Sequence, residues 1–228
     1  MLKLHTIRTQ GVRIRIFVTA TNTDIGKTHT ILLLMEEAAR RGLRPAAFKP
    51  IETGVTPKGP ADGLKLLHAM RRLNPDTERL AVGDIVPYRF ELPAAPFVAK
   101  GETKIRYDYL EEKMKEVERL CDILFIEGAG GLMVPIDGER FMIDLPRLFD
   151  AHTLLVAPGR LGSINDTLLS IETLRNRGIG FDLAVNLRKE REDFEKVTRP
   201  YYRAARIDHC LLPEESCTCL DRLMRSGG

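Results

Sequence analysis

Short apolar runs alternate along the chain with segments in which apolar residues recur every three or four positions. The first pattern is typical of strands buried in a parallel sheet, and the second of helices that pack against such a sheet. Strands are therefore predicted at residues 14–19, 46–49, 123–126, 153–157 and 182–186, and helices at 28–41, 62–72, 108–120 and 163–176. The alternation predicts an α/β fold with a single doubly wound, mostly parallel sheet and helices on both faces.

The length of 228 residues suits one domain, so residues 1–228 are expected to form a single unit. Residues 1–13 are basic and interrupted by polar positions, and we expect them to be an N-terminal extension. The proline-rich segment 75–102 has weak periodicity and is expected to form loops over the face that carries the site. Beyond residue 190 the pattern predicts no definite element.

Composition narrows the classes of function. The chain has 35 basic and 32 acidic residues, and this balance does not favour a nucleic-acid-binding surface. No apolar run approaches the roughly 18 residues of a membrane span. A cytoplasmic protein with neither a nucleic-acid nor a membrane partner is therefore expected.

Four cysteines are present, and none lies in a CxxC pair. Cys121 precedes an apolar strand and is expected to be a buried thiol. Cys210, Cys217 and Cys219 lie close together in sequence, but a zinc site needs further ligands at workable spacing. Reduced thiols are the favoured interpretation, and the role of the cluster stays open.

The segment from Phe17 to Thr28 carries the strongest chemical signal. An apolar strand ends, a polar loop follows, and Gly26-Lys27-Thr28 opens an amphipathic helix. In a phosphate-binding loop, backbone N–H groups at the helix start hold phosphate oxygens, the lysine reaches the β and γ phosphates, and the hydroxyl binds Mg²⁺. The usual leading glycine is absent, since Thr21 stands in its place. The position of the GKT sequence between strand and helix still favours a phosphate loop.

Two other predicted strands end in groups that suit the same site. Lys49 ends the second strand, and Glu127 follows the strand 123–126 and precedes a glycine-rich turn. Ligands of open α/β sheets bind outside the carboxyl ends of the strands, so these side chains are expected to lie near the phosphates. Each alone could be a surface residue, but the three strand ends together favour a nucleotide site.

Taken together, these segments resemble the dethiobiotin synthetase family. Its phosphate loop, close to G-T-D-T-[DE]-V-G-K-T, is similar to residues 20–28. Its motifs K-P-x-x-[ST]-G, [VI]-E-G-A-G-G and G-x-[IL]-N are similar to residues 49–54, 126–131 and 162–165. The resemblance implies a P-loop fold and a homodimer.

The family's reaction uses ATP to join CO₂ and 7,8-diaminononanoate into the ureido ring of dethiobiotin, in biotin biosynthesis. One amine captures CO₂ as a carbamate, ATP phosphorylates a carbamate oxygen to a carbamic-phosphoric anhydride, and the second amine expels phosphate. Such a route depends on positioning and charge neutralisation more than on a protein nucleophile. The resemblance thus implies a ligase with ATP as co-substrate and Mg²⁺ as cofactor.

The resemblance also implies roles for single residues. Those implied as catalytic are Thr23, Lys27 and Lys49, and those implied as the magnesium shell are Thr28, Asp62 and Glu127. Those implied to contact the nucleotide are Asp24, Ile25, Gly26, Lys27, Thr28, His29, Asp62, Glu127, Gly128, Ala129, Gly130 and Asn186. Those implied to contact the substrate are Thr53 and, from the neighbouring subunit, Gly162, Ser163 and Asn165. Without the resemblance, Asp62, Ser163 and Asn165 would be interpreted as helix-capping residues.

The chain departs from the family at two places. Ala20 and Asn22 differ from the commonest loop residues, but both are small, so phosphate binding is expected to survive. The family often carries G-x-[IL]-P near the last strand, and residues 207–214 contain no such glycine. Selectivity for adenine therefore stays open.

Three other functions were weighed against this one. A partitioning-type switch ATPase uses a second lysine in the phosphate loop, where this chain has Thr21 and Asn22. A cobalamin-pathway amidoligase normally carries a glutaminase domain, for which the chain is too short. A non-catalytic homologue is disfavoured by the retained Lys27, Lys49 and Glu127.

Overall fold

The computed structural model describes residues 14–188 and 190–227, so the predicted N-terminal extension lies outside the described residues. In this part of the chain a central six-stranded sheet has the order β2-β5-β1-β6-β7-β8, and every neighbouring pair is parallel. Its strands are β1 (Ile14–Ala20), β2 (Pro45–Phe48), β5 (Ile123–Gly131), β6 (His152–Pro158), β7 (Phe181–Asn186) and β8 (Cys210–Leu212). The predicted α/β fold class is confirmed, and the five predicted strands are present.

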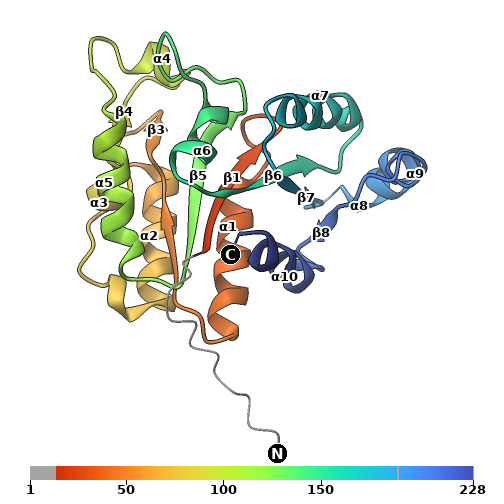
Figure 1. Cartoon of the computed structure of the whole chain (residues 1–228), viewed down its shortest axis with the longest axis horizontal. Helices are drawn as coiled ribbons and strands as arrows, with labels where there is room; N and C mark the ends of the chain where they lie inside the picture. The colour runs from red at the N-terminus through yellow and green to blue at the C-terminus, as the bar shows by residue number, and fades with distance from the viewer. Residues whose placement is uncertain (1–13, 189, 228) are drawn as a thin grey trace, which may run out of the picture.

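The longer helices are α1 (Lys27–Arg40), α2 (Ala61–Leu73), α5 (Tyr107–Glu118), α7 (Ser163–Asn176) and α10 (Ser216–Ser226). The first four match the four predicted helices to within two residues at either end. Figure 1 shows α10 beside α1, although the two are far apart in sequence. No described helix is both long enough and apolar enough to cross a membrane.

The sheet buries both faces, and its strands show this residue by residue. In β6, Leu154 and Val156 belong to the core cluster that also contains residues of α1 and α10. The alternating residues Leu155 and Ala157 belong to a second cluster with Ile171 of α7. Because neighbouring side chains of a strand point to opposite faces, helices cover both sides of the sheet.

The prediction of loops over residues 75–102 was wrong. The segment folds into short pieces: η1 (Pro75–Thr77), α3 (Val82–Ile85), β4 (Tyr88–Phe90) and α4 (Pro96–Ala99). β4 pairs in parallel with β3 (Ile51–Thr53), outside the main sheet. Pro75 and Pro96 open η1 and α4, where a missing N–H costs no helical hydrogen bond. Proline therefore marks the starts of these helices instead of excluding them.

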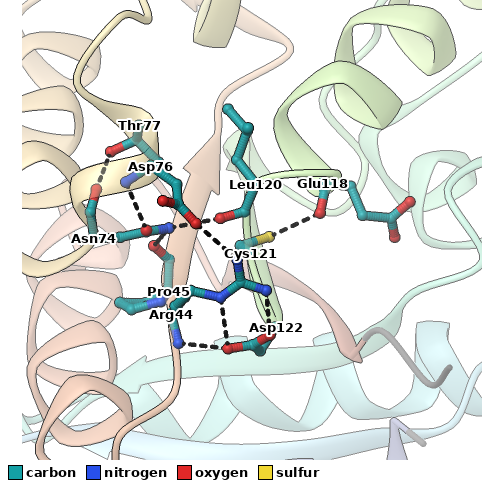
Figure 2. A network of polar contacts seen from close by, with 9 residues as sticks. All are labelled: Arg44, Pro45, Asn74, Asp76, Thr77, Glu118, Leu120, Cys121 and Asp122. Carbon is teal, nitrogen blue, oxygen red and sulfur yellow. Dashed lines mark hydrogen bonds and ion pairs between the residues drawn. The ribbon is translucent and has the colours of Figure 1, made fainter. Parts of the chain in front are cut away.

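A polar network fixes the amino ends of β2 and β5 (Figure 2). Asn74 is fully buried, and its amide donates to the backbone oxygens of Pro45 (3.1 Å) and Leu120 (2.9 Å). Arg44 donates to both carboxylate oxygens of Asp122, at 3.1 Å and 2.7 Å. The end of α2 is thus held to the starts of β2 and β5. Further along, β2 leads to Lys49 and β5 contains Glu127, which are two of the predicted site residues.

Beyond residue 190, where the sequence predicted nothing definite, the chain completes the sheet. It forms α8 (Arg191–Asp193), a π-helical turn η3 (Phe194–Thr198), α9 (Arg199–Ala204), β8 and α10. The remaining short pieces, η2 (Met142–Asp144) and α6 (Leu145–Leu148), connect β5 to β6. Cys121, Cys210 and Cys219 are buried thiols, and Cys217 is exposed.

Candidate active site at the strand ends

The predicted phosphate loop joins β1 to α1, and the helix begins at Lys27 as the sequence predicts. Gly26 precedes it with φ of 102°, a conformation that side chains rarely adopt. A Cβ at this position would also lie 2.2 Å from Nδ2 of Asn186. Glycine is therefore required here for both backbone and space, and the free N–H groups of the α1 start face the loop.

Lys27 is buried at the start of α1, where its Nζ donates to the backbone oxygen of Asn22 at 3.3 Å. Burial lowers the pKa of Lys27 to about 8; Glu127 opposes this shift and Lys49 adds to it. For this amine the cost of burial outweighs the stabilisation that the nearby carboxylates give to its charge. A bound polyphosphate would supply further stabilisation.

Two side chains donate to Glu127, which is 1% exposed. The Thr28 hydroxyl donates to its Oε1 at 3.0 Å, and Lys49 Nζ donates to the same oxygen at 2.5 Å. Lys49 Nζ also lies 3.4 Å from Oδ2 of Asp62. Although burial acts to lower it, the pKa of Lys49 is raised because Glu127 and Asp62 stabilise the ammonium. The start of α1, the end of β2 and the middle of β5 are therefore linked by direct side-chain contacts.

The oxygens of Thr28, Asp62 and Glu127 fit a magnesium ion in type. Oε2 of Glu127 is buried with no hydrogen-bond partner among the described residues. The pKa of Asp62 lies below its ordinary value because, although burial acts to raise it, Lys49 and Lys65 stabilise the carboxylate. Within the described residues no three His, Cys, Asp or Glu side chains could hold a metal by themselves. In proteins, Mg²⁺ is commonly held by one or two carboxylates together with substrate phosphates.

These groups line a cavity of about 550 Å³. The predicted site residues that line it are Thr23, Asp24, Gly26, Lys27, Thr28, His29, Lys49, Thr53, Asp62, Glu127, Gly128, Ala129 and Gly130. Two predicted nucleotide residues lie behind the lining: Ile25 is buried in the core, and Asn186 donates to its backbone oxygen at 3.0 Å. The cavity volume is within the range of small-molecule sites.

The residues predicted to bind substrate from a neighbouring subunit lie outside this cavity, at the start of α7. Gly162 takes φ of 88°, Ser163 is buried and Asn165 is exposed. The Ser163 hydroxyl has no hydrogen-bond partner among the described residues, and Asn165 donates to Asp166 at 3.2 Å. Neither side chain accepts a backbone N–H at the start of α7, so the structure gives no support to the alternative that they are helix caps.

Comparison with known proteins agrees with the geometry. A family model described as an AAA domain matches residues 14–199. The protein named ATP-dependent dethiobiotin synthetase BioD of Sulfurovum sp. (strain NBC37-1) is 51% identical over 189 residues, which cover 83% of this chain and 90% of that relative. Its namesake from Wolinella succinogenes is 41% identical over 191 residues, covering 82% and 88%. The chain belongs to the dethiobiotin synthetase family. It is accordingly a ligase.

A solved plasmid partition protein from Borrelia burgdorferi has a similar fold, with a TM-score of 0.56 and 10% identity over 94% of this chain and 99% of that one. At this identity the likeness shows the P-loop fold that the dethiobiotin synthetase family shares with other nucleotide-binding proteins.

The motifs of the dethiobiotin synthetase family did not point to four residues that line the cavity. They are Leu32, Glu52, Lys65 and Arg188. Glu52 and Lys65 both contact Asp62, and burial raises the pKa of Glu52 while Lys49 and two backbone N–H groups oppose the shift. Glu52 falls on a variable position of the K-P-x-x-[ST]-G motif. No sequence signal singled it out, and the structure places it within the short strand β3.

Proposed function

We propose that this protein closes the ureido ring of dethiobiotin from 7,8-diaminononanoate, CO₂ and ATP. The observation that carries the proposal is the contact of Thr28 and Lys49 with one buried oxygen of Glu127, at the edge of a cavity that the phosphate loop also lines. This arrangement concentrates two lysines and two carboxylates where a phosphoryl group would pass. Membership in the family named for this product supports the choice of substrates.

The reaction needs no nucleophile from the protein. One substrate amine attacks CO₂ and loses a proton, which gives a carbamate. A carbamate oxygen then takes the γ-phosphoryl group of ATP, and the second amine attacks the carbonyl carbon and expels inorganic phosphate. Charge builds up on the oxygens that exchange the phosphoryl group, and fixed cations lower the energy of that charge.

In this proposal, Lys27 and Lys49 are the cations that stabilise the charge on these oxygens. Lys27 opens α1, so its amine and the helix N–H groups would hold the β and γ phosphates together. Lys49 contacts the same Glu127 oxygen as Thr28, and its ammonium would lie between the phosphoryl group and the carbamate. Thr23 and Thr53 line the same cavity and would orient the nucleotide and the substrate.

Mg²⁺ would be held by Thr28, Asp62 and Glu127, and when bound it neutralises phosphate charge. Lys49 meets Glu127 and Asp62 in the protein described here. With Mg²⁺ held by these carboxylates, the Lys49 ammonium would be available to the substrate.

We also propose that the protein acts as a homodimer in the cytoplasm, with Gly162, Ser163 and Asn165 of one subunit reaching the substrate carboxylate bound to the other. The exposed Leu161 (73%) and Leu169 (55%) flank this segment and suit burial against a second subunit.

The test is ATP turnover measured with and without 7,8-diaminononanoate and bicarbonate, with dethiobiotin detected by mass spectrometry. ADP release that requires both co-substrates and matches the dethiobiotin formed supports the proposal. ATP turnover that ignores the diamine would contradict it and favour the switch-ATPase alternative.

A further inference from the structure

The start of α2 is capped by a carboxylate from another element. Glu52 of β3 is 6% exposed, and its Oε1 accepts the backbone N–H of Asp62 at 3.0 Å, while its Oε2 accepts that of Gly63 at 2.9 Å. The residue at the usual capping position is Pro60, whose side chain cannot accept a hydrogen bond. Glu52 therefore satisfies two N–H groups that α2 itself leaves free.

Close packing keeps the two elements in this register. A Cβ at Gly63 would lie 2.4 Å from Cγ2 of Val86 and 3.3 Å from Oε2 of Glu52. Only glycine lets the first turn of α2 pack so closely against Val86 and the Glu52 carboxylate. The buried Glu52 carboxylate therefore lies against a tightly packed first turn of α2.

Asp62 is thus held at both ends. Its backbone N–H is bound to Glu52, and its carboxylate receives Lys49 at 3.4 Å and Lys65 at 3.1 Å. Both oxygens of Glu52 are already engaged by backbone N–H groups, so this carboxylate is committed to α2 although it lines the cavity. The side chain of Asp62, by contrast, is held by lysines that can move.

We infer that Glu52 is a positioning residue, which fixes the backbone of Asp62 so that the Asp62 carboxylate faces the magnesium–nucleotide site. The inference rests on the role proposed above for Asp62. It assigns no contact between Glu52 and the metal or the nucleotide. Partners that orient a metal ligand typically change metal affinity by ~10–100-fold when they are altered.

Glu52→Gln tests this inference, because it keeps the shape but turns an NH₂ group toward one of the two backbone N–H donors. Binding of the non-hydrolysable analogue AMPPNP is measured by calorimetry over a magnesium titration. We expect the half-saturating magnesium concentration to rise ~10-fold or more, with little change in binding of the analogue in EDTA. Glu36→Gln, an exposed glutamate paired with Arg72, is the matched control and is expected to leave the titration unchanged.

A double-mutant cycle separates positioning from a general loss of stability. If Glu52 acts through Asp62, then adding Glu52→Gln to Asp62→Asn changes the magnesium titration little further. An equal effect in both backgrounds, or an unchanged titration in Glu52→Gln alone, would overturn the inference. Should Glu52→Gln fail to fold, Glu52→Asp carries the same test, because it keeps the charge and shortens the reach by one carbon. Since the readout is binding, a wild-type protein that binds magnesium and AMPPNP but makes no dethiobiotin would contradict only the proposed function.

Discussion

Lys49 Nζ and Glu127 Oε1 lie 2.5 Å apart, Lys49 directly after β2 and Glu127 within the neighbouring parallel strand β5, and both side chains are at least 95% buried. Neither charge reaches bulk water, so each is stabilised chiefly by the other and by the groups around them. This pair joins the phosphate loop to the rest of the site, because Thr28 donates to the same oxygen.

Replacing Lys49 by methionine is expected to lower stability as well as activity. Glu127 would be left as a buried charge without its partner, which typically costs about 3–5 kcal/mol of unfolding free energy. Lys65→Met is the matched control, since Lys65 pairs with Asp62 at 3.1 Å but is 60% exposed, and loss of such an exposed pair costs under about 1 kcal/mol. Urea unfolding of the ligand-free proteins measures both. Equal losses in the two variants would show that the Lys49–Glu127 pair is not the buried, mutually dependent contact described here.

Nucleotide binding is expected to take up protons at mildly alkaline pH. Burial lowers the pKa of Lys27 to about 8, so at pH 8.5 most of the free protein carries a neutral amine at this position. Bound phosphates favour the ammonium and raise its pKa, so binding draws a proton from the buffer, and affinity falls as the pH rises through about 8. Calorimetry at pH 8.5 in two buffers of different ionisation enthalpy measures the uptake.

His29 also lines the cavity. His29→Asn is the control, and the uptake is expected to persist in it. Binding without proton uptake, or uptake that disappears in His29→Asn, would assign the titration to a group other than Lys27.

Much of the site could be predicted from the sequence because ligands of open α/β sheets bind beyond the carboxyl ends of the strands. Lys49 and Glu127 are 78 positions apart, yet parallel neighbouring strands bring their carboxyl ends to one edge, so their meeting was predictable. The GKT sequence likewise had to open a helix, because Gly26 allows the turn that precedes it.

Glu52 could not be predicted in the same way. Its contact with Asp62 and Gly63 depends on how closely α2 packs against β3, and no local pattern encodes that distance. The short elements between residues 75 and 102 have too few residues for a period to emerge. The same holds for the three-residue strand β8 and the π-helical turn before it. The place of β8 at the edge of the sheet therefore followed from the structure alone.

A subunit-mixing experiment tests the shared site. A Lys27→Ala chain and a chain with Ser163→Ala and Asn165→Ala are each expected to be folded and inactive as homodimers. If the turn before α7 serves the neighbouring subunit, each mixed dimer regains one intact site. Random mixing in equal amounts then restores about a quarter of wild-type activity, because half of the dimers are mixed and one of their two sites works. Mixed dimers that form but stay inactive would place the turn and the phosphate loop of each site in the same chain.

The central claim is that a carbamate oxygen, and not water, accepts the phosphoryl group beside Lys27 and Lys49. Isotope transfer tests it most directly. The reaction is run in unlabelled water with freshly added C¹⁸O₂, ATP, Mg²⁺ and 7,8-diaminononanoate, for a time short enough to limit exchange with the solvent. Phosphate and dethiobiotin are then analysed by mass spectrometry. We predict one ¹⁸O in each phosphate and one in the ureido carbonyl of each dethiobiotin, since CO₂ gives one oxygen to each product. Phosphate that carries no ¹⁸O while the dethiobiotin is labelled would contradict phosphoryl transfer to a carbamate.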